Sequence, residues 1–488
     1  MELNTIDLVV IGVFFLLMLL IGVWSYFRNK NAEDYFIAGG KLPWWLSGIS
    51  HHVSGYSGAV FVAYAGLAYT HGFSVYIWWA LTIGITVILS AKVFPVFWVR
   101  LRKRFQIQSP LEFLITRYNL PTQQLMAWSG VTLKLFDIGA KWAAIAILLN
   151  VFTGVSLPVG IWISGGISLI YITFGGLWAV IITDFAQFIV QILAGLVMFV
   201  VVLQKLGGFD AIFTMWDQLP KGNSQAFNDP YTVGFALVFL FINFLSYNGG
   251  QWNLATRYIS SPSEQQASKA AWLSGALYLV WPLILFFPMW AAPIILPNME
   301  DPTQSYGILT MELLPVGLIG LVIASLFANT MSMTSSDINT ISAVITRDIL
   351  PALSKKFKDK NTSLVTARLT TFLFTLGTII VALQFERFGG VLGLIISWFG
   401  ALVGPIAVPM LFGLIPWFKS CGPKAAIGSI LVGLTAFVFT KNYELNNLAL
   451  EVGLPVISST ITYIFIGFLQ RDHVPEKVKK MLEDIAQE

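Results

Sequence analysis

One aspartate stands inside a long apolar stretch of this sequence. Asp184 lies about two helical turns into the apolar segment 177–203. A charge at membrane depth is costly, so an ionisable residue at such a position is a functional candidate by default. No basic residue adjacent in the sequence offsets this carboxylate, and an unpaired carboxylate in an apolar medium needs a cation or a proton. A bound metal ion would supply the charge, and protonation of Asp184 is the alternative.

Three serines form a second polar cluster, in the segment 314–346. Ser332, Ser335 and Ser336 stand at positions i, i+3 and i+4, so a helix places their hydroxyl groups on one face. Hydroxyl oxygens are hard ligands that suit hard cations. Serines also permit close packing of membrane helices, which is the alternative interpretation of the cluster. Together with Asp184, the three serines favour a sodium site.

Three charged residues share one face of the segment 124–150. Lys134, Asp137 and Lys141 are separated by three and then four positions, which brings them together on a helix. One interpretation is a stripe that is buried between helices and neutralises its own charges. The other is the lining of a polar cavity, in which Asp137 and Lys141 form an ion pair that faces a substrate.

Short polar runs interrupt two further apolar segments. Residues 54–58 (SGYSG) interrupt the segment 43–64 near its middle, and residues 247–250 (YNGG) suit a second break. Glycines and serines at such positions indicate a broken helix whose freed carbonyl groups face a cavity, which is how transporters build ion sites. His51 and His52 precede the first break, and each either binds substrate or fills a packing role.

The elements that hold these residues must be membrane helices. Of 488 residues, 56% are hydrophobic and 11% are charged, whereas soluble domains carry roughly 25% charged residues. A water-soluble enzyme is excluded, as is a single-pass receptor with a large soluble domain. The net charge of +4 does not indicate a nucleic-acid partner, because the cations lie in short clusters between apolar stretches. The single cysteine, Cys421, excludes a disulfide framework and a cysteine-based metal site.

The apolar stretches predict about thirteen membrane spans, each with the roughly 20 residues that a crossing helix needs. The predicted spans are 6–26, 43–64, 73–98, 124–150, 157–174, 177–203, 232–248, 270–295, 314–346, 363–384, 390–416, 425–441 and 452–470. The odd number places the two termini on opposite sides of the membrane.

The basic residues predict which side is which. With the N-terminus outside, most of the 29 Lys and Arg residues fall in cytoplasmic segments, as the positive-inside rule requires. Arg257 is counted among those cytoplasmic loop residues. We therefore expect a multi-pass protein of the plasma (cell inner) membrane, embedded in the lipid bilayer with its N-terminus outside and its C-terminus in the cytoplasm.

Several motifs, in order along nearly the whole chain, resemble those of the sodium/solute symporter family, which includes sodium–sugar, proline, pantothenate, iodide and sialic acid carriers. The motifs are EDYFIAGG at 33–40 followed by PWW at 43–45, SPLEF at 109–113 followed by Arg117-Tyr118, GGLWAVIITDFAQ at 175–187, Arg257-Tyr258, and the serine cluster continued to Asp348.

The resemblance implies an all-α membrane protein with the leucine-transporter fold, built from two inverted five-helix repeats. The implied organisation is an extra N-terminal span and loop at 1–42, a first repeat at 43–203, an outer loop at 204–231, a second repeat at 232–416, and two extra spans with a cytoplasmic tail at 417–488. It also implies alternating access, in which inward Na⁺ flux drives solute uptake. We expect the chain to work as a monomer.

The resemblance also implies two sodium positions. The site shared across the family falls at Val53, Tyr56, Asn329 and Ser332, with Met333 in place of a second hydroxyl ligand. Since a thioether is a poor ligand for Na⁺, this site is weakened or completed by another oxygen. The additional site of the sialic acid symporter uses an aspartate and three serines, which match Asp184, Ser332, Ser335 and Ser336. We infer that one or two Na⁺ ions bind per cycle.

The expected solute cavity combines aromatic rings with a few hydrogen-bonding groups. Its candidates are Ser54, Ser57, His51, His52, Trp78, Trp79, Asp137, Lys141, Trp142, Tyr247, Asn248, Gln251, Trp252 and Ser397. Because the C–H faces of sugars stack on tryptophan, this set favours a sodium–sugar symporter.

Two alternatives stay open at this stage. One is a carrier of an organic anion such as sialic acid or another carboxylate, with Lys141 as the counter-charge. The other, of a different class, is a transporter-like solute sensor. An enzyme is not expected, because no nucleophile and base with suitable spacing stand out in the spans.

Overall fold

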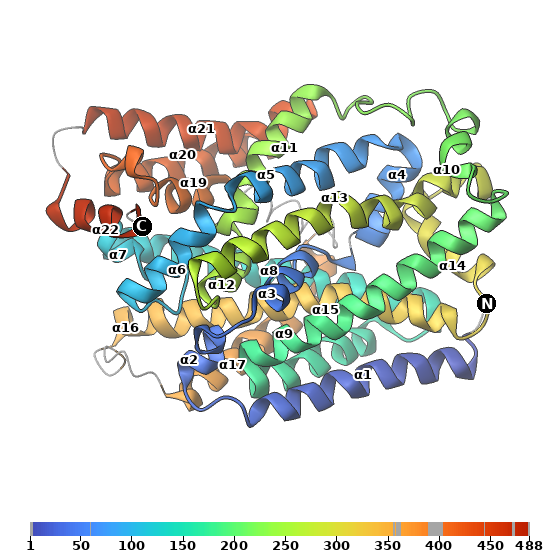
Figure 1. Cartoon of the computed structure of the whole chain (residues 1–488), viewed down its shortest axis with the longest axis horizontal. Coiled ribbons are helices and arrows are strands. Elements are labelled where there is room, and N and C mark those ends of the chain that lie inside the picture. Colours follow the sequence, from blue (N-terminus) through green and yellow to red (C-terminus); the bar gives the residue numbers. More distant parts are fainter. Residues whose placement is uncertain are drawn as a thin grey trace.

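The computed structural model of the chain is an all-α bundle whose long helices run roughly along one common axis (Figure 1). It describes residues 3–58, 60–354, 357, 363–388, 404–443, 445–470 and 474–486. The chain ends lie at opposite ends of the bundle (Figure 1), which agrees with an odd number of membrane crossings. Predicted site residue Ser397 and most of the predicted span 390–416 lie outside the described residues.

Most predicted spans correspond to helices. The α-helices are α1 (Thr5–Tyr26), α2 (Ala32–Ile37), α3 (Trp44–Val53), α4 (Ala65–His71), α5 (Thr82–Ser90), α6 (Phe94–Phe105), α7 (Leu114–Arg117), α8 (Leu120–Thr153), α9 (Leu157–Lys205), α10 (Ala211–Thr214), α11 (Val233–Leu245), α12 (Trp252–Ile259), α13 (Glu264–Ile295), α14 (Ser305–Leu313), α15 (Leu318–Val344), α16 (Leu350–Leu353), α17 (Leu364–Ala382), α19 (Gly404–Phe412), α20 (Pro423–Asn442), α21 (Leu448–Leu469) and α22 (Glu476–Ala486).

Within the described residues, eight helices are long and apolar enough to cross a membrane, and nine if the pair 76–90 and 94–105, bent by 53°, counts as one span. Helix α8 carries three charged residues in its middle, and the span at 43–64 is broken into short pieces. These two predicted spans are not among the apolar helices counted above, because they contain polar residues of the candidate site.

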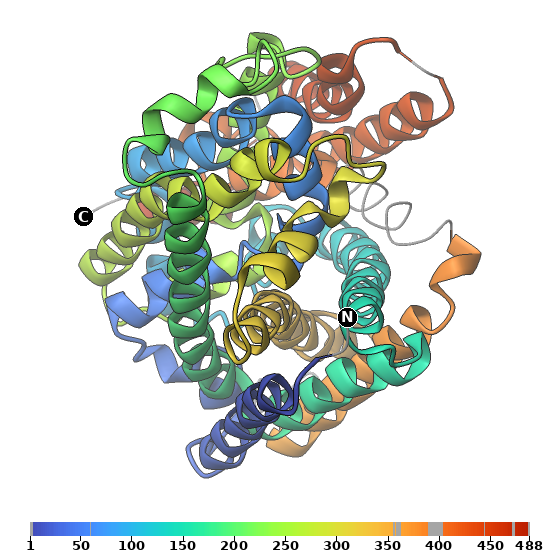
Figure 2. The ribbon, with the colours of Figure 1, turned by 90° about the vertical axis from the view of Figure 1, so that its right-hand side faces the viewer.

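Helix α15 forms the centre of the bundle. Nearly every residue from Ile319 to Val344 is buried, and the helix is seen almost end-on among its neighbours in Figure 2. Helices at the periphery expose large apolar side chains instead, such as Leu20 on α1, Val280 on α13 and Phe465 on α21. A polar centre surrounded by an exposed apolar belt is the pattern of a protein that lies in lipid.

The predicted break at 54–58 is confirmed. Helix α3 ends at Val53, and helical structure resumes with the π-helical turn η2 (Val60–Tyr64), which leads into α4. Gly55 allows the tyrosines of neighbouring helices to approach, since a Cβ there would lie 1.9 Å from Tyr278 Oη. Within the break, the backbone N–H groups of Gly55 and Tyr56 bond to the carbonyl oxygens of His52 and Val53 at 3.2 and 3.0 Å.

The predicted break at 247–250 is also confirmed. Helix α11 passes into the π-helical turn η5 (Ser246–Gly250), and α12 begins at Trp252. Gly249 has φ 127°, a backbone conformation that L-residues with side chains rarely adopt. The short helix α12 that follows this break is completely buried.

The predicted spans 157–174 and 177–203 form one helical element, α9, with a kink between them. At 1.5 Å per residue a straight helix of 49 residues would be about 74 Å long, more than twice the hydrocarbon thickness of a bilayer. Gly176 interrupts the helix with φ 54° and ψ −148°, and Tyr35 packs directly against it. The kink therefore lets each of the two predicted spans cross one membrane thickness. It also sets the position of Asp184, which lies in the part of α9 that follows Gly176.

Candidate ion and solute sites

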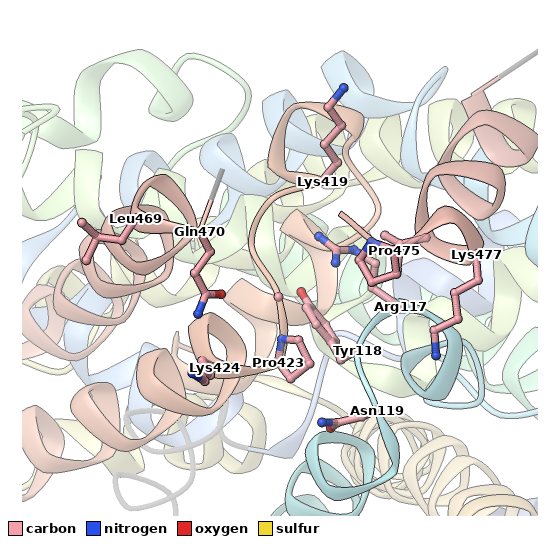
Figure 3. Close-up of a pocket in the computed structure, with 12 residues that line it drawn as sticks. Arg117, Tyr118, Asn119, Lys419, Pro423, Lys424, Leu469, Gln470, Pro475 and Lys477 are labelled. Carbon is pink, nitrogen blue, oxygen red and sulfur yellow. The ribbon is translucent and has the colours of Figure 1, made fainter. Parts of the chain in front are cut away.

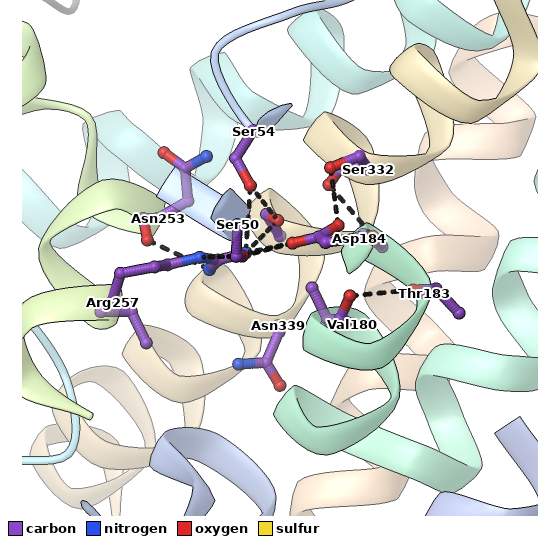
Figure 4. Close-up of polar contacts among 12 residues, drawn as sticks. Ser50, Ser54, Val180, Thr183, Asp184, Asn253, Arg257, Ser332 and Asn339 are labelled. Atoms are coloured by element: carbon purple, nitrogen blue, oxygen red, sulfur yellow. Dashed lines mark hydrogen bonds and ion pairs between the residues drawn. The ribbon is translucent and has the colours of Figure 1, made fainter. Parts of the chain in front are cut away.

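The carboxylate of Asp184 is paired with the guanidinium of Arg257. Both side chains are completely buried, and Arg257 Nη2 lies 3.2 Å from Asp184 Oδ2. Asp184 comes from α9 and Arg257 from the last turn of α12 (Figure 4). No basic residue adjacent in the sequence offsets Asp184, and its counter-charge comes instead from a residue 73 positions away. The placement of Arg257 in a cytoplasmic loop is wrong, because this residue lies in the buried helix α12.

Hydroxyl groups from two more helices complete this network. Ser50 and Ser332 donate to the two carboxylate oxygens of Asp184, Ser332 at 2.6 Å. Arg257 donates to Ser50, Ser54 and Ser336, and the last two hydroxyls lie 2.9 Å apart. The two broken segments thus meet α9 and α15 in one buried cluster (Figure 4).

The three predicted serines do not all point to the same partner. Ser332 binds Asp184 and Ser336 binds Arg257, whereas Ser335 donates to the Ser332 carbonyl oxygen at 3.1 Å. All three side chains are fully buried. The helical spacing correctly predicts that Ser332 and Ser336 lie in one cluster with Asp184.

The residues expected for the shared sodium site come from two places: Val53 and Tyr56 lie at the first break, and Asn329 lies about one turn before Ser332 on α15. Asn329 donates to the Ser325 carbonyl oxygen, while its own buried Oδ1 has no hydrogen-bond partner in the part of the chain that the structure describes. The carbonyl oxygen of Val53 accepts from the backbone N–H of Tyr56 at 3.0 Å. Met333 is 6% exposed. Orphaned Asn329 Oδ1 is therefore an oxygen available to a cation.

Thr330 links this part of α15 to the first break. The backbone N–H of Gly58 donates to Thr330 Oγ1 at 3.0 Å. Since Gly58 closes the break, this bond holds the broken helix against α15 at the level of Asn329. Sequence reasoning passes over Thr330, because threonine is ordinary on a buried helix face.

The charged stripe on α8 is joined by a fourth residue, Asp337 of α15. Lys134 lies 3.2 Å from Asp137 and 2.8 Å from Asp337, and Lys141 lies 2.7 Å and 3.2 Å from the same two carboxylates. No member is more than 5% exposed. Two cations and two anions thus form a formally neutral buried cluster, which we call the charge quartet.

The charge quartet decides between the two interpretations of the stripe in this conformation. Lys141 is already shared by two carboxylates, so it does not present an isolated positive charge to a solute. Asp337 adjoins Ser336 in the sequence, but a helical step of about 100° turns it toward α8. Sequence spacing finds the three residues on α8 and misses Asp337, whose partners lie on another helix.

The two histidines before the first break have different roles. His51 hydrogen-bonds to Ser274 Oγ, the Tyr247 carbonyl oxygen and Tyr258 Oη, at 2.7, 3.2 and 2.9 Å. This is the packing alternative. His52 is equally buried, yet neither ring nitrogen has a hydrogen-bond partner among the described residues.

Aromatic rings surround His52. Its ring centroid lies 4.9 Å from that of Tyr56 and 4.5 Å from that of Tyr278. Tyr56 stacks on Tyr278 and meets Trp79 edge-on, while Tyr247 meets Tyr278. The hydroxyl of Tyr56 has no partner in the described part of the chain. The break thus places unpartnered polar groups of His52 and Tyr56 within an aromatic cluster.

Three further predicted solute residues have buried polar atoms without a hydrogen-bond partner among the described residues: Trp78 Nε1, Gln251 Oε1 and Trp252 Nε1. Trp78 stacks on Tyr231, and the ring of Trp252 lies against Gly130 of α8. Ser57 is half-buried.

Other predicted solute residues are committed to contacts within the protein. Trp142 Nε1 donates to Thr378 Oγ1 at 3.1 Å. Asn248 accepts from Ser90 and donates to the Phe244 carbonyl oxygen. Ser54 belongs to the network around Asp184, and Asp137 and Lys141 belong to the charge quartet.

Comparison with known proteins tests the resemblance. The profile of the "Sodium:solute symporter family" matches residues 35–433. The chain belongs to this family. The symporter is 28% identical to the sodium/sialic acid symporter SiaT of Proteus mirabilis, with 87% of each chain covered. It is 25% identical to the sodium/sialic acid symporter NanT of Aliivibrio fischeri, over 92% of this chain and 89% of the relative. The sodium/glucose cotransporter of Vibrio parahaemolyticus is 26% identical, over 90% and 86%.

Solved structures establish the fold of the symporter. The substrate-bound outward-open state of a Na⁺-coupled sialic acid symporter matches with a TM-score of 0.83 at 22% identity, covering 96% of this chain and 98% of that one. Mhp1, a nucleobase-cation-symport-1 family transporter in a closed conformation, matches with a TM-score of 0.61 at 13% identity, over 93% and 99%. The predicted leucine-transporter fold is confirmed.

These findings fix the class of the protein. It is a multi-pass membrane transporter that couples a small-molecule solute to Na⁺, and it is not an enzyme. The predicted family, the membrane setting and sodium as the coupling ion are confirmed.

Proposed function

We propose that this symporter imports a sugar acid of the sialic acid type together with Na⁺. The observation that carries the proposal is the set of unpartnered buried polar groups on His52 and Tyr56, which lie in an aromatic cluster at the first helix break. Aromatic faces with a few hydrogen-bonding groups suit a polyhydroxylated solute. Two of the compared relatives carry sialic acid, which is a sugar and an anion at once.

The proposed Na⁺ position is the Oδ1 side of Asp184, next to Ser332, Ser335 and Ser336. Carboxylate and hydroxyl oxygens are hard ligands, which suit this ion. Arg257 lies on the opposite carboxylate oxygen, Oδ2. In this arrangement the guanidinium of Arg257 balances the negative charge of Asp184. When Na⁺ binds, it balances part of that charge and weakens the attraction between Asp184 and Arg257.

A second Na⁺ position is proposed at the carbonyl oxygens of Val53 and Tyr56 with the oxygens of Asn329 and Ser332. The unpartnered Oδ1 of Asn329 supports it. Met333 lowers the number of oxygen ligands there. We therefore expect the Asp184 position to hold Na⁺ more tightly than the position beside Met333.

Arg257 connects the ion to the solute cavity. It bonds to Ser50 and Ser54, which flank the end of α3, while His52 lies between these two residues in the sequence. A cation that weakens the ion pair between Asp184 and Arg257 would also change the hydrogen bonds that Arg257 makes to the first break. Coupling requires only that Na⁺ stabilise the solute-competent state more than the other state.

The finer architecture is part of the proposal. We propose inverted repeats at 43–203 and 232–416, flanked by segments 1–42, 204–231 and 417–488. Each proposed repeat begins with a broken helix, at 54–58 and at 247–250, and this correspondence supports the division.

We also propose that the protein works as a monomer in the plasma membrane with its N-terminus outside. The distribution of basic residues supports this orientation.

The test is uptake of radiolabelled sialic acid into proteoliposomes. We expect accumulation with an inward Na⁺ gradient and none in choline at equal ionic strength. Unlabelled sialic acid should compete, and galactose and simple carboxylates should compete poorly. Equal uptake in choline and sodium would show that the solute is not coupled to Na⁺.

A neutral sugar is the second candidate, because the groups without partners among the described residues at His52, Tyr56 and Gln251 are neutral hydrogen-bonding groups and the charge quartet already engages Lys141. The glucose cotransporter among the relatives also favours it. Sodium-dependent uptake of labelled galactose or glucose, with no uptake of sialic acid, would show that the solute is a neutral sugar and not a sugar acid.

A further inference from the structure

A cavity separate from the ion and solute sites opens at the end of the bundle where α20 begins and α21 ends. Its volume is about 770 Å³, and Figure 3 shows its lining. The walls come from the turn between α7 and α8, from the segment before α20, from the end of α21 and from the start of α22. These elements are distant in the sequence from both sodium positions.

The lining of this cavity is strongly basic. Arg117, Lys419, Lys424 and Lys477 contribute four cations, and none of the described residues that line it carries a carboxylate. The three lysines are exposed, so their ammonium groups can move toward a ligand. A concave surface with cations of one sign attracts an anion.

Arg117 anchors the cavity. It is 1% exposed, donates to the carbonyl oxygens of Gly413 and Phe418 at 2.7 and 2.6 Å, and lies over the ring of Tyr118. Its charge has no carboxylate partner among the described residues. A buried guanidinium held only by neutral groups leaves positive potential at the wall of the cavity.

The first turn of α20 adds to that potential. Its first residue Pro423 has no N–H and the N–H of Ala426 bonds to the Gly422 carbonyl oxygen, while the N-cap residue Gly422 makes no side-chain capping bond. The free N–H groups of this 20-residue helix are therefore those of Lys424 and Ala425. Helix N-termini carry a partial positive charge that favours phosphate.

Apolar side chains place the cavity at the edge of the membrane. Leu469, in its lining, is the last residue of the apolar helix α21 and is 67% exposed. Trp417, two residues from Lys419, is 91% exposed. Tryptophan and lysine are typical of the membrane–water interface. A ligand here meets basic groups and the hydrocarbon boundary together.

We propose that this cavity binds the phosphate headgroup of an anionic phospholipid, with Lys419, Lys424 and Lys477 around the phosphate and the acyl chains along the exposed end of α21. The chemistry recognised is a phosphate anion, which a soluble phosphate shares. Exposed Leu469 and Trp417 favour the lipid, because a soluble phosphate gains nothing from apolar surface. The amphipathic helix α22, whose Val478, Met481, Leu482 and Ile485 are buried against the bundle, closes one side of the site.

The test measures thermal unfolding of the purified full-length protein in a neutral detergent. The added probes are dioleoylphosphatidylglycerol, dioleoylphosphatidylcholine and potassium phosphate, all at constant Na⁺. We expect a saturable rise in unfolding temperature with phosphatidylglycerol and none with phosphatidylcholine. The variant K419Q/K424Q/K477Q should weaken the apparent affinity for phosphatidylglycerol by on the order of tenfold or more, since each basic residue near a membrane surface strengthens such binding.

The matched control removes three lysines that are exposed and lie outside the cavity. This control variant is K30Q/K41Q/K103Q, with the same change in net charge. It should keep the wild-type response to phosphatidylglycerol. Equal loss in both variants would mean that general surface charge, and not this cavity, attracts the lipid.

Two other results would also overturn the proposal. An unchanged phosphatidylglycerol response in K419Q/K424Q/K477Q would remove the cavity from lipid binding. A response to potassium phosphate as large as that to phosphatidylglycerol would assign the site to a soluble phosphate. Because none of the three lysines is buried, the variant is expected to fold, and its unfolding temperature without lipid checks this.

Discussion

Replacement of Arg257 by glutamine gives the most direct test of how the buried cluster handles a cation. In the structure Asp184 is completely buried and its charge is balanced by Arg257 Nη2 at 3.2 Å. Arg257→Gln removes that balance while it keeps hydrogen-bonding groups near Ser50 and Ser336. Since the carboxylate then lacks a counter-charge, Na⁺ should bind Asp184 more tightly than in the wild type.

The size of the effect follows from the geometry. Two unit charges 3.2 Å apart attract each other by about 5 kcal/mol at an effective dielectric constant of about 20. If Na⁺ at the same carboxylate recovers about half of this, its binding gains about 2.5 kcal/mol, which corresponds to an affinity on the order of 50-fold tighter. Without Na⁺ the variant should lose about 3–5 kcal/mol of folding stability, as expected when one partner of a buried ion pair is removed.

The assay is a Na⁺ titration followed by thermal unfolding, with choline chloride used to keep ionic strength constant. Arg257→Lys keeps the charge and should stay close to the wild type. Asp184→Asn should weaken Na⁺ binding, and the double variant Asp184→Asn/Arg257→Gln should lose the gain shown by Arg257→Gln alone.

One result would refute this reasoning. If folded Arg257→Gln binds Na⁺ with unchanged or lower affinity, the guanidinium does not share Asp184 with the ion. Sodium binding would then depend on oxygens elsewhere, and the position assigned beside Asp184 would be wrong.

Three further variants test other parts of the protein. Asp337→Asn leaves excess positive charge in the charge quartet and should destabilise the protein by about 3–5 kcal/mol. Unfolding measurements should show that adding Lys141→Met restores part of this stability. An unchanged stability of Asp337→Asn would contradict the ion pairs assigned to Asp337. Met333→Ser should tighten Na⁺ binding in the same titration, and an unaltered affinity would mean that this position contributes no ligand. His52→Ala should raise the KM for solute uptake by about 5- to 150-fold, since a lost hydrogen bond to a buried group costs about 1–3 kcal/mol. Trp142→Phe, whose indole donates to Thr378, should leave the KM unchanged. Equal effects in both variants would remove His52 from the solute site.

Much of the fold could be predicted from the sequence because its determinants are local. Apolar runs of span length predict the helices, and glycines with serines predict the breaks at 54–58 and 247–250. Both breaks are present, with Gly249 at positive φ and Gly55 against Tyr278. The separation of the predicted spans 157–174 and 177–203 is likewise present, because Gly176 adopts non-helical angles between the two parts of α9.

The candidate site is predictable only in part, because hydropathy indicates depth in the membrane and not which helices meet. Spacing within one helix predicts that Lys134, Asp137 and Lys141 lie together. It gives no sign of Asp337, which is 203 positions from Lys134. Hydropathy places Arg257 in a loop because the short helix α12 lacks an apolar run of span length, yet this helix is wholly buried.

The charge quartet limits how the bundle can move. Helices α8 and α15 are joined by two buried ion pairs, from Lys134 and Lys141 of α8 to Asp337 of α15, at 2.8 and 3.2 Å. A slip of one residue along α15 would carry Asp337 about 1.5 Å along the axis and swing it about 100° away from both lysines. We therefore expect α8 and α15 to move together as one rigid body. The conformational change that opens the solute site to either side of the membrane would then come from movement of the broken helices relative to this pair.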